Sequence, residues 1–421
     1  MLRFVFASLV LSGCYLSHEL EERPDDFLPP DFGMTDATVA RDLGTDLGPA
    51  DAGCVPGLAD GSVTVPLDGG TLVTTCGAAY GECAEPGTPD SDRDGDGFPT
   101  RVDCNDCEAG INPGAYDLPS NGYDEDCDGL DGLPPCPAVE AGDGPSPRDA
   151  LAALGLCRDA DEGWGVISAR LGSADLMQPL ASEEQITVVD QMGVNDPLAG
   201  SQMLSISSGA AREPSGLTPL RCANFDSPHG FPEGFPVESP ACPGVMSGSP
   251  FDSLGLEVRL KVPTNAVALT FASFFFTQEY PSFICSSFND FYAVLLERDG
   301  EPSANIAFDM EGNPISVNAS FLEACIAGNY GGRRFDCSLG TEPLGGTGFD
   351  SDSCAGRLPF RRIAGAGTGW LRTTTPVTGG EEITLRFVIW DSGDGWFDSM
   401  ALIDAFEWVV RPPVGPDCPT C

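Results

Sequence analysis

Residues 256–276 read LEVRLKVPTNAVALTFASFFF, the clearest strand signal in the chain. Over 256–262 an apolar residue occupies every second position, and charged residues lie between them. This period of two is typical of a strand with one buried face. The almost uninterrupted apolar run at 267–276 predicts a central strand in the core.

Three further segments, 291–296, 383–389 and 400–410, continue this pattern toward the C-terminus. Turns rich in Gly, Pro and Asn separate them, so we expect a mainly β domain that forms an antiparallel sandwich or jelly roll. One helix is expected at the start of this domain, because Ser146 can cap it and Pro147 suits its first turn.

The composition excludes several classes of protein. The 421 residues include 64 acidic and 21 basic side chains, a net charge of −43. Nucleic-acid binding is not expected, because it needs a basic surface to neutralise phosphate. No apolar run approaches the roughly 20 residues of a membrane-spanning helix. These features predict an acidic, turn-rich β protein, and they leave its oligomeric state open.

Seventeen cysteines indicate an oxidising compartment and disulfides. Residues 1–13 combine one positive charge with an apolar segment, as export signals do. The following Leu11-Ser12-Gly13-Cys14 resembles the lipobox of bacterial lipoproteins. The resemblance implies that a lipid on Cys14 anchors the exported chain in the outer membrane, at the cell surface, and leaves sixteen cysteines to pair. The alternative is an ordinary secretory signal with a single unpaired thiol.

We expect the chain to divide into segments of distinct composition. Prolines and like charges keep an acidic segment open as a tether, and a proline-rich stretch separates the Asp-rich module from the large domain. The expected segments are a signal peptide at 1–13, the lipidated Cys14 with a tether at 14–53, a small Cys-rich segment with one strand at 54–87, a metal-binding module at 88–132, a linker at 133–144, the β-sandwich domain at 145–411 and a Cys-containing tail at 412–421.

The strongest chemical signal is the stretch DRDGDGFPTRVD at 92–103. An EF-hand-type calcium loop takes oxygens from positions 1, 3, 5, 7, 9 and 12 and needs Gly at position 6. Gly97 occupies position 6, and no flanking helices are evident, so we expect such a loop outside the EF-hand fold. The alternative is an acidic linker whose Asp-Gly pairs are only turns. The expected ligands are Asp92, Asp94, Asp96, the Phe98 carbonyl, Thr100 and Asp103.

A second cluster, formed by Asp124, Asp126 and Asp128 before Gly129, repeats the spacing, although its position 12 would be Pro135. Residues 88–132 contain 13 acidic side chains and 2 arginines, so their net charge is 2 − 13 = −11. This density repels itself unless cations offset it. We therefore expect Ca²⁺ as the bound cofactor.

The module resembles the metal-binding motif of MopE-related proteins. The shared residues are 92–98, 103–107, 112–115 and 121–127. Some members of that family are linked to copper, but the module has no His or Met, so the resemblance implies a hard divalent cation here. Cys104, Cys107 and Cys127 leave one sulfur to pair outside the trio, and zinc at Cys104 and Cys107 is the alternative to disulfides.

The large domain carries a second acidic set at the ends of its expected strands. The members Glu279, Asp290, Asp391, Asp394 and Asp398 could hold one Ca²⁺, or they could be turn-forming residues of a solvated rim. Four aromatic residues near these loops could stack on a sugar. They are Tyr280, Trp370, Trp390 and Trp396.

These segments also resemble the choice-of-anchor L domain. The residues that carry the resemblance lie at 200–209, 277–281, 288–290, 305–307, 314–318 and 391–399. The resemblance covers about 145–411 and implies an exported, surface-anchored bacterial β domain. The family has no settled activity, so the resemblance names no substrate.

Catalysis finds little support in the sequence. The two histidines are His18, in the tether, and His229, in a Pro/Gly-rich loop, and neither adjoins a nucleophile motif. We therefore expect a non-catalytic, calcium-stabilised surface lipoprotein with an adhesive or structural role, whose partner would be a glycan or a surface protein. The alternative is a calcium-dependent carbohydrate-binding module. A third hypothesis, a hydrolase of envelope polymers, requires a cleft with two opposed carboxylates.

Overall fold

The computed structural model describes residues 88–214, 220–223, 225–308, 312–319, 321–350 and 365–411, together with the backbone of three short strands at 16–17, 62–67 and 70–75. The signal peptide predicted at 1–13, the lipidation predicted at Cys14, the tail at 412–421 and most of the predicted tether and of segment 54–87 lie outside the described residues. Within the described part, no helix has the length and apolar character needed to cross a membrane.

Strands account for most of the regular structure, and the one α-helix among the described residues is α1 (Pro147–Ala152). The strands are β1 (Leu16–Ser17), β2 (Ser62–Leu67), β3 (Gly70–Thr75), β4 (Gly142–Asp143), β5 (Gly165–Gly172), β6 (Ile186–Val189), β7 (Met203–Ser207), β8 (Pro250–Lys261), β9 (Ala266–Thr277), β10 (Phe291–Arg298), β11 (Ala304–Asn305), β12 (Gly328–Tyr330), β13 (Arg333–Phe335), β14 (Ala366–Gly367), β15 (Leu371–Pro376), β16 (Glu382–Ser392) and β17 (Ser399–Val410). The 3₁₀ turns are η2 (Ala160–Glu162), η3 (Glu183–Gln185), η4 (Leu220–Cys222) and η5 (Glu342–Leu344).

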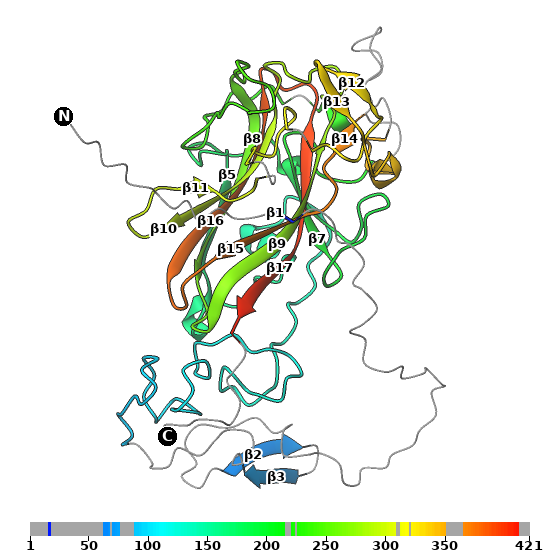
Figure 1. The fold of residues 1–421 in the computed structure, drawn as a ribbon. Helices are drawn as coiled ribbons and strands as arrows, with labels where there is room; N and C mark the ends of the chain where they lie inside the picture. Colours follow the sequence, from blue (N-terminus) through cyan, green and yellow to red (C-terminus); the bar gives the residue numbers. More distant parts are fainter. Residues whose placement is uncertain are drawn as a thin grey trace, which may run out of the picture.

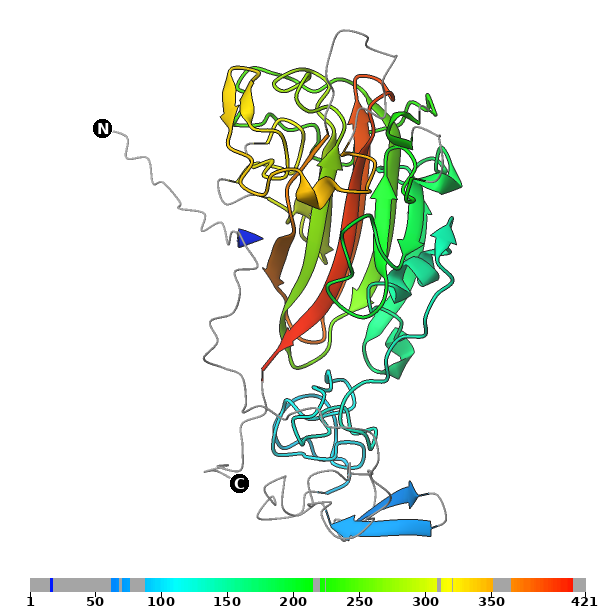
Figure 2. The ribbon, with the colours of Figure 1, turned by 90° about the vertical axis from the view of Figure 1, so that its right-hand side faces the viewer.

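Two antiparallel sheets pack face to face, as Figures 1 and 2 show. The order of the larger sheet is β1-β15-β9-β17-β7-β6-β4, with β14 beside β9, and the order of the smaller sheet is β11-β10-β16-β8-β5. The predicted antiparallel sandwich is therefore confirmed. All five strands expected at 256–262, 267–276, 291–296, 383–389 and 400–410 are present, as parts of β8, β9, β10, β16 and β17.

The core lies between the sheets, and the apolar faces of the long strands fill it. Phe271 of β9 and Phe387 of β16 meet edge to face across the core, with ring centroids 5.4 Å apart. In β16 the opposite face is also covered, since Trp390 stacks on Phe291 there at 5.1 Å. Burial of each such side chain is worth about 1.5–3 kcal/mol, which explains why the long apolar strands dominate the fold.

The Asp-rich module, residues 88–132, contains no helix or strand, and it packs directly against one end of the sandwich (Figure 2). Tyr116 and Asn265 exchange two hydrogen bonds, of 2.8 and 2.9 Å. The Trp164 indole donates to the Ala115 carbonyl at 2.6 Å. The predicted linker at 133–144 also follows the surface of the domain, because the Cys136–Cys157 disulfide holds it and β4 pairs with β6.

Candidate metal centre

The loop that begins at Asp92 is shaped by its own carboxylates. Asp92 accepts hydrogen bonds from the backbone N–H groups of Gly95, at 2.7 Å, and Gly97, at 3.0 Å. Gly97 has φ +96°, a conformation that side chains rarely tolerate, so the glycine expected at position 6 is required for the turn. Both oxygens of Asp92 therefore fold the loop.

Three other aspartates use one oxygen for the backbone and leave the second without a partner. The Oδ1 atoms of Asp94, Asp96 and Asp103 accept from N–H groups two residues further on, at 3.3, 2.8 and 2.9 Å. The Oδ2 atoms of the same residues are buried and have no hydrogen-bond partner in the described part of the chain. One carboxylate oxygen from each lies within 4.8 Å of the other two. Oxygens that share one Ca²⁺ at 2.3–2.6 Å lie at most about 5 Å apart, so this trio fits a single ion.

Burial also changes the acidity of this trio. It raises the pKa of Asp94 to about 6 and that of Asp103 to about 8, and the neighbouring carboxylates add to both rises. The pKa of Asp96 is raised as well, chiefly by burial, although the Asn112 side chain opposes part of the rise. Buried carboxyl groups with raised pKa values keep their protons to higher pH, and a divalent cation that binds them would displace those protons.

The remaining expected ligands of this loop have other contacts. The Thr100 hydroxyl bonds to Asp106, which the sequence reading missed, and to the Ser91 carbonyl at 3.0 Å. Asp92, Asp94 and Asp106 form an adjoining group whose carboxylate oxygens also lie within 4.8 Å of one another. The Phe98 ring occupies the space that a side chain at Gly114 would need. The structure therefore brings together Asp94, Asp96 and Asp103. The Thr100 hydroxyl holds the loop through its hydrogen bonds, and the Phe98 carbonyl stays a predicted ligand.

The second loop reproduces the backbone hydrogen bonds of the first. Asp124 accepts from the N–H groups of Asp128, at 3.1 Å, and Gly129, at 3.0 Å. Asp126 accepts from the N–H of Asp128 at 3.3 Å, and Asp128 accepts from that of Leu130 at 2.8 Å. The repeated sequence spacing therefore corresponds to a repeated turn.

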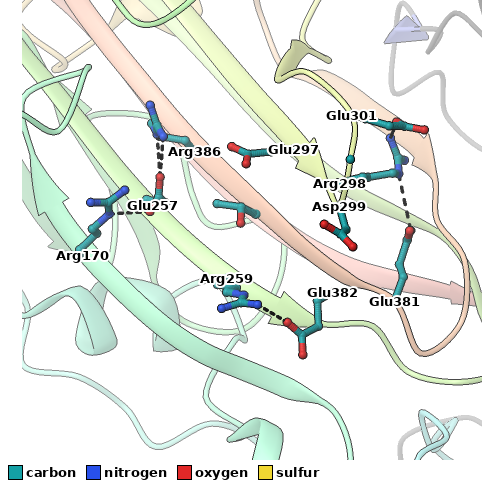
Figure 3. A pocket seen from close by; sticks show the side chains of 12 residues that line it. Arg170, Glu257, Arg259, Glu297, Arg298, Asp299, Glu301, Glu381, Glu382 and Arg386 are labelled. Atoms are coloured by element: carbon teal, nitrogen blue, oxygen red, sulfur yellow. Dashed lines mark hydrogen bonds and ion pairs between the residues drawn. The ribbon is translucent and has the colours of Figure 1, made fainter.

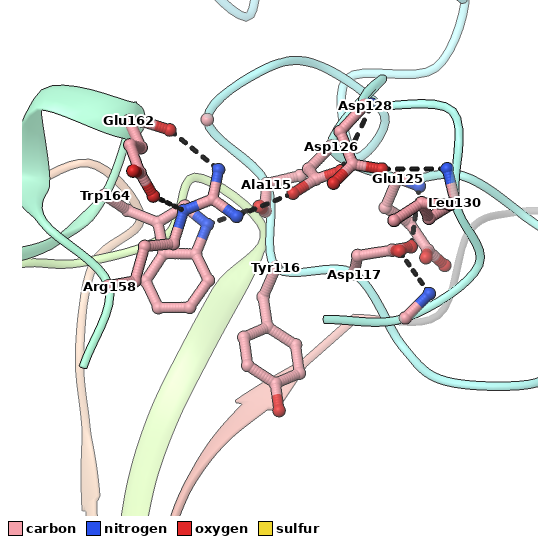
Figure 4. A network of polar contacts seen from close by, with 12 residues as sticks. Ala115, Tyr116, Asp117, Glu125, Asp126, Asp128, Leu130, Arg158, Glu162 and Trp164 are labelled. Atoms are coloured by element: carbon pink, nitrogen blue, oxygen red, sulfur yellow. Dashed lines mark hydrogen bonds and ion pairs between the residues drawn. The ribbon is translucent and has the colours of Figure 1, made fainter. Parts of the chain in front are cut away.

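The second loop differs because a guanidinium group already occupies it. Arg158, from the sandwich domain, places Nη1 2.8 Å from Oδ2 of Asp126, whose side chain is fully buried (Figure 4). Carboxylate oxygens of Asp117, Asp124 and Asp126 lie within 4.8 Å of one another, whereas the expected ligand Asp128 is not in that group. Burial raises the pKa of Asp124 to about 7 and that of Asp117 to about 8. Asp117 was missed because it lies outside the Asp-x-Asp-x-Asp pattern.

The cysteines of the module are oxidised. Cys104 and Cys127 form a disulfide with Cα atoms 5.8 Å apart, and Cys107 is also disulfide-bonded, so it pairs outside the trio as expected. A zinc site at Cys104 and Cys107 is therefore excluded in this structure, because neither sulfur is a thiolate.

The acidic set of the sandwich is buried, not solvated. Glu279, Asp290, Asp391 and Asp398 are each at most 2% exposed, and they come from the ends of β9, β10, β16 and β17. Asp290 accepts from the Ser392 N–H at 2.9 Å and from the Ser399 hydroxyl at 2.7 Å. The expectation that these strand ends converge is met, while Asp394 is only half-buried and accepts from the Trp396 N–H at 3.2 Å.

This set also contains oxygens without partners. Among the described residues, Glu279 Oε2, Asp391 Oδ2 and Asp398 Oδ1 are buried and have no hydrogen-bond partner. Burial raises the pKa of all three well above the ordinary range, and charged neighbours within the set add to the rise. Unlike the Asp94 trio, no three of these carboxylates have oxygens within 4.8 Å of one another in the described part of the structure. The arrangement is looser than a formed cation site.

Two of the four aromatic candidates are unavailable to a sugar. Tyr280 and Trp390 are 0% exposed. The Tyr280 hydroxyl donates to the Ile326 carbonyl at 2.6 Å, and Trp390 belongs to the core. Trp370 is half-buried against Phe274, whereas Trp396 is 42% exposed beside Asp394. Burial therefore contradicts the stacking role for Tyr280 and Trp390 and leaves it open for Trp396.

The outer face of the smaller sheet carries a polar groove of about 870 Å³ that the sequence reading did not identify (Figure 3). Its arginines are paired: Arg170 and Arg386 both contact Glu257, at 2.5 and 2.6 Å. Burial would raise the pKa of Glu257, but hydrogen bonds from the two arginines outweigh it and lower that pKa. The alternation of charges along β8 was the available signal for this ladder of ion pairs.

His229 contacts a serine, but the serine is not accessible. The Ser253 hydroxyl lies 3.0 Å from Nδ1 of His229, and it accepts from the Ala174 N–H at 2.9 Å. Ser253 is 0% exposed, and burial lowers the pKa of His229. This pair therefore offers a substrate no exposed nucleophile.

Comparison with known proteins gives little. No protein-family description matches the chain, and no curated protein matches it. One solved structure, of TmCBM61 in complex with beta-1,4-galactotriose, is similar over 58% of this chain and 90% of that one, at 7% identity and a TM-score of 0.23. A likeness of this size carries no conclusion about ligands.

Proposed function

We propose that this chain is a non-catalytic, calcium-stabilised lipoprotein of a bacterial cell surface, with an adhesive or structural role. One cluster supports the calcium assignment above all other features: Asp94, Asp96 and Asp103 each have a buried oxygen without a partner, and one carboxylate oxygen of each lies within 4.8 Å of the other two. The lipid anchor at Cys14, the outer-membrane location and the likeness to MopE-related and choice-of-anchor L proteins rest on sequence patterns alone.

In this proposal Ca²⁺ acts on the shape of the module. The ion would bind the Oδ2 atoms of Asp94, Asp96 and Asp103, while their Oδ1 atoms keep their backbone hydrogen bonds. It would offset the repulsion among the buried carboxylates and displace the protons that burial favours. Because the module is bonded to the sandwich through Tyr116 and Trp164, a stiffer loop would hold the whole domain in a fixed orientation.

The test is a calcium titration of the secreted chain with Cys14 replaced by serine. Calorimetry should show saturable binding, and at 100 times Kd the ion should add about 2.7 kcal/mol to the free energy of unfolding. Asp94→Asn with Asp96→Asn should abolish binding at this loop, while Asp90→Asn with Glu108→Gln, a matched loss of two charges in the same module, should retain it. Binding that persists unchanged in the double variant would overturn the assignment.

The alternative is a calcium-dependent carbohydrate-binding module. The observation that favours it is Trp396, which is 42% exposed in the loop between β16 and β17, two residues from Asp394. Large exposed rings of this kind are enriched at binding surfaces. Loss of oligosaccharide binding in Trp396→Ala, with calcium binding intact, would favour this alternative over a structural role.

A further inference from the structure

A pocket of about 440 Å³ lies where the Asp-rich module, the linker and the sandwich meet. Its walls come from parts of the chain far apart in sequence: Tyr116 in the module, Pro135 in the linker, Arg158 and Trp164 before β5, and Phe406 and Trp408 in β17. Ligand pockets commonly have 300–1,000 Å³ and form where structural units adjoin. The module contributes Tyr116 to this pocket, and the linker contributes residues 133–137.

Four aromatic rings line the pocket, beside prolines and other residues of the linker. Trp164 and Trp408 are 4% and 6% exposed and meet edge to face with centroids 6.5 Å apart. Tyr116 and Phe406 are half-buried and flank them, at 5.4 Å from Trp164 and 5.3 Å from Trp408. The two tryptophans therefore make a fixed floor, and the two half-buried rings offer apolar surface to a ligand.

Polar groups lie in the same pocket. Among the described residues, the indole N–H of Trp408 is a buried donor without a hydrogen bond. Nε of Arg158 lies 3.9 Å from Oε2 of Glu162, an ion pair that is longer than a hydrogen bond. Tyr116, which carries a hydroxyl, is half-buried in the pocket lining. Glu162 and Glu407 are exposed on the rim and supply acceptors beside their long ion pairs with Arg158 and Arg372. A ligand that presents oxygen atoms and hydroxyl groups would satisfy both kinds of group.

The charges around the pocket exclude other ligand classes. Arg158 already lies over the Trp164 ring, 5.0 Å from its centroid, which disfavours a second cation there. Three carboxylates, those of Glu162, Glu407 and Asp126, pair with only two arginines, Arg158 and Arg372, so the local charge disfavours an anion. A purely apolar ligand would leave the buried Trp408 donor without an acceptor. The ligand class that remains is a neutral ring with an apolar face and with hydroxyl groups at its edge.

We infer that this junction pocket binds a sugar residue of a neutral oligosaccharide. The ring of the sugar packs against Tyr116 and Phe406, and its hydroxyl groups bond with the Tyr116 hydroxyl and the carboxylates of the rim. The inference goes beyond the calcium role, since the pocket needs the module to be docked but takes no metal itself. It also lies apart from Trp396, so the two positions can be tested separately.

The experiment is a titration of the secreted Cys14→Ser chain, in saturating Ca²⁺, with cellotetraose, xylotetraose, mannotetraose and galactotetraose. Tryptophan emission and calorimetry report binding. At least one probe should bind saturably, and Phe406→Ala should weaken it by about tenfold, the size of a lost aromatic contact. Tyr116→Phe, which removes only a hydroxyl, should weaken it severalfold. Met177→Ala, at an 80% exposed position that does not line the pocket, is the control that retains it.

Unchanged melting temperatures of Tyr116→Phe and Phe406→Ala establish that the variants fold, since both residues are half-buried. No saturable binding by any of the four tetrasaccharides would overturn the inference. So would binding that survives Phe406→Ala but is lost in Trp396→Ala. Calcium binding is measured separately, so a failure of the sugar site is distinct from a failure of the calcium assignment.

Discussion

Arg158 occupies the second aspartate loop at the position where the first loop has carboxylate oxygens without partners. Substitution of Arg158 therefore tests the electrostatics of the second loop directly. Arg158 is 19% exposed and its partner Asp126 is 0% exposed, with 2.8 Å between the charged groups. The guanidinium also donates to the Glu162 carbonyl at 2.7 Å and lies over Trp164. Loss of one member of a buried pair leaves the other charge uncompensated, which costs about 3–5 kcal/mol.

We therefore expect Arg158→Gln to lower the free energy of unfolding by about 3–5 kcal/mol without added calcium. Arg148→Gln is the matched control, because Arg148 and Asp159 form an exposed pair with side chains 44% and 59% exposed. Such pairs are worth about 0.2–1 kcal/mol. Denaturant unfolding of both variants, with Asp126→Asn and the double variant Arg158→Gln/Asp126→Asn, gives the coupling energy between the two groups.

The same variant should gain a metal site. Without Arg158, the oxygens of Asp117, Asp124 and Asp126 would face one another with no counter-ion, in a loop whose backbone hydrogen bonds match those of the first loop. Calorimetry should show one more equivalent of Ca²⁺ than in the unaltered chain, and the added ion should restore part of the lost stability. An unchanged stoichiometry together with additive effects of the two single substitutions would refute the reasoning.

Three further results are expected. Calcium affinity should rise about 100-fold between pH 6 and pH 8, because Asp94 and Asp103, with pKa values of about 6 and 8, must lose their protons to bind the ion. Calorimetry at the two pH values would give equal affinities if both carboxyl groups were already ionised at pH 6. Without calcium, stability should fall as the pH rises from about 4 to 8, since the folded state holds the Asp103 proton that the unfolded chain releases, and Asp103→Asn should flatten this slope in thermal melting. Gly209→Ala should lower the free energy of unfolding by about 1–3 kcal/mol or more, because the added Cβ would lie 1.8 Å from Oδ2 of the buried Asp398. Gly110→Ala is the control, since its Cβ meets nothing nearer than 3.6 Å. Equal melting temperatures of the two variants would argue against the packing described at Asp398.

Much of the fold could be predicted from the sequence, because the long strands carry a strong pattern. β8, β9, β16 and β17 each have 11 or 12 residues and a continuous apolar face. Among the strands that sequence reasoning missed, β6 is short, with four residues, and β15 is polar and reads LRTTTP. A segment of this length is stabilised by its neighbours in the sheet, and its own sequence gives little sign of them.

The candidate site was predictable only where its residues are close in sequence. The spacing at 92–103 identified Asp94, Asp96 and Asp103, because a single loop positions all three. It could not identify Arg158, which lies 32 residues from Asp126 and reaches it only after the module docks on the sandwich. The same limit applies to the junction pocket, whose walls share no local pattern.

The aspartates of the module have two separable tasks, which accounts for a segment that keeps a defined shape without helix or strand. Buried backbone N–H groups must find acceptors, and here side-chain oxygens take the place of a sheet or a helix. In Asp94, Asp96 and Asp103 one oxygen accepts from the backbone, while the other is buried and has no hydrogen-bond partner among the described residues. Asparagine retains the first oxygen and removes the charge, whereas alanine removes both. Substitution by Asn should therefore abolish cation binding and leave the loop folded, while substitution by Ala should also unfold the loop, an effect that loss of protection of the Phe98 and Asn105 amides from hydrogen exchange would report.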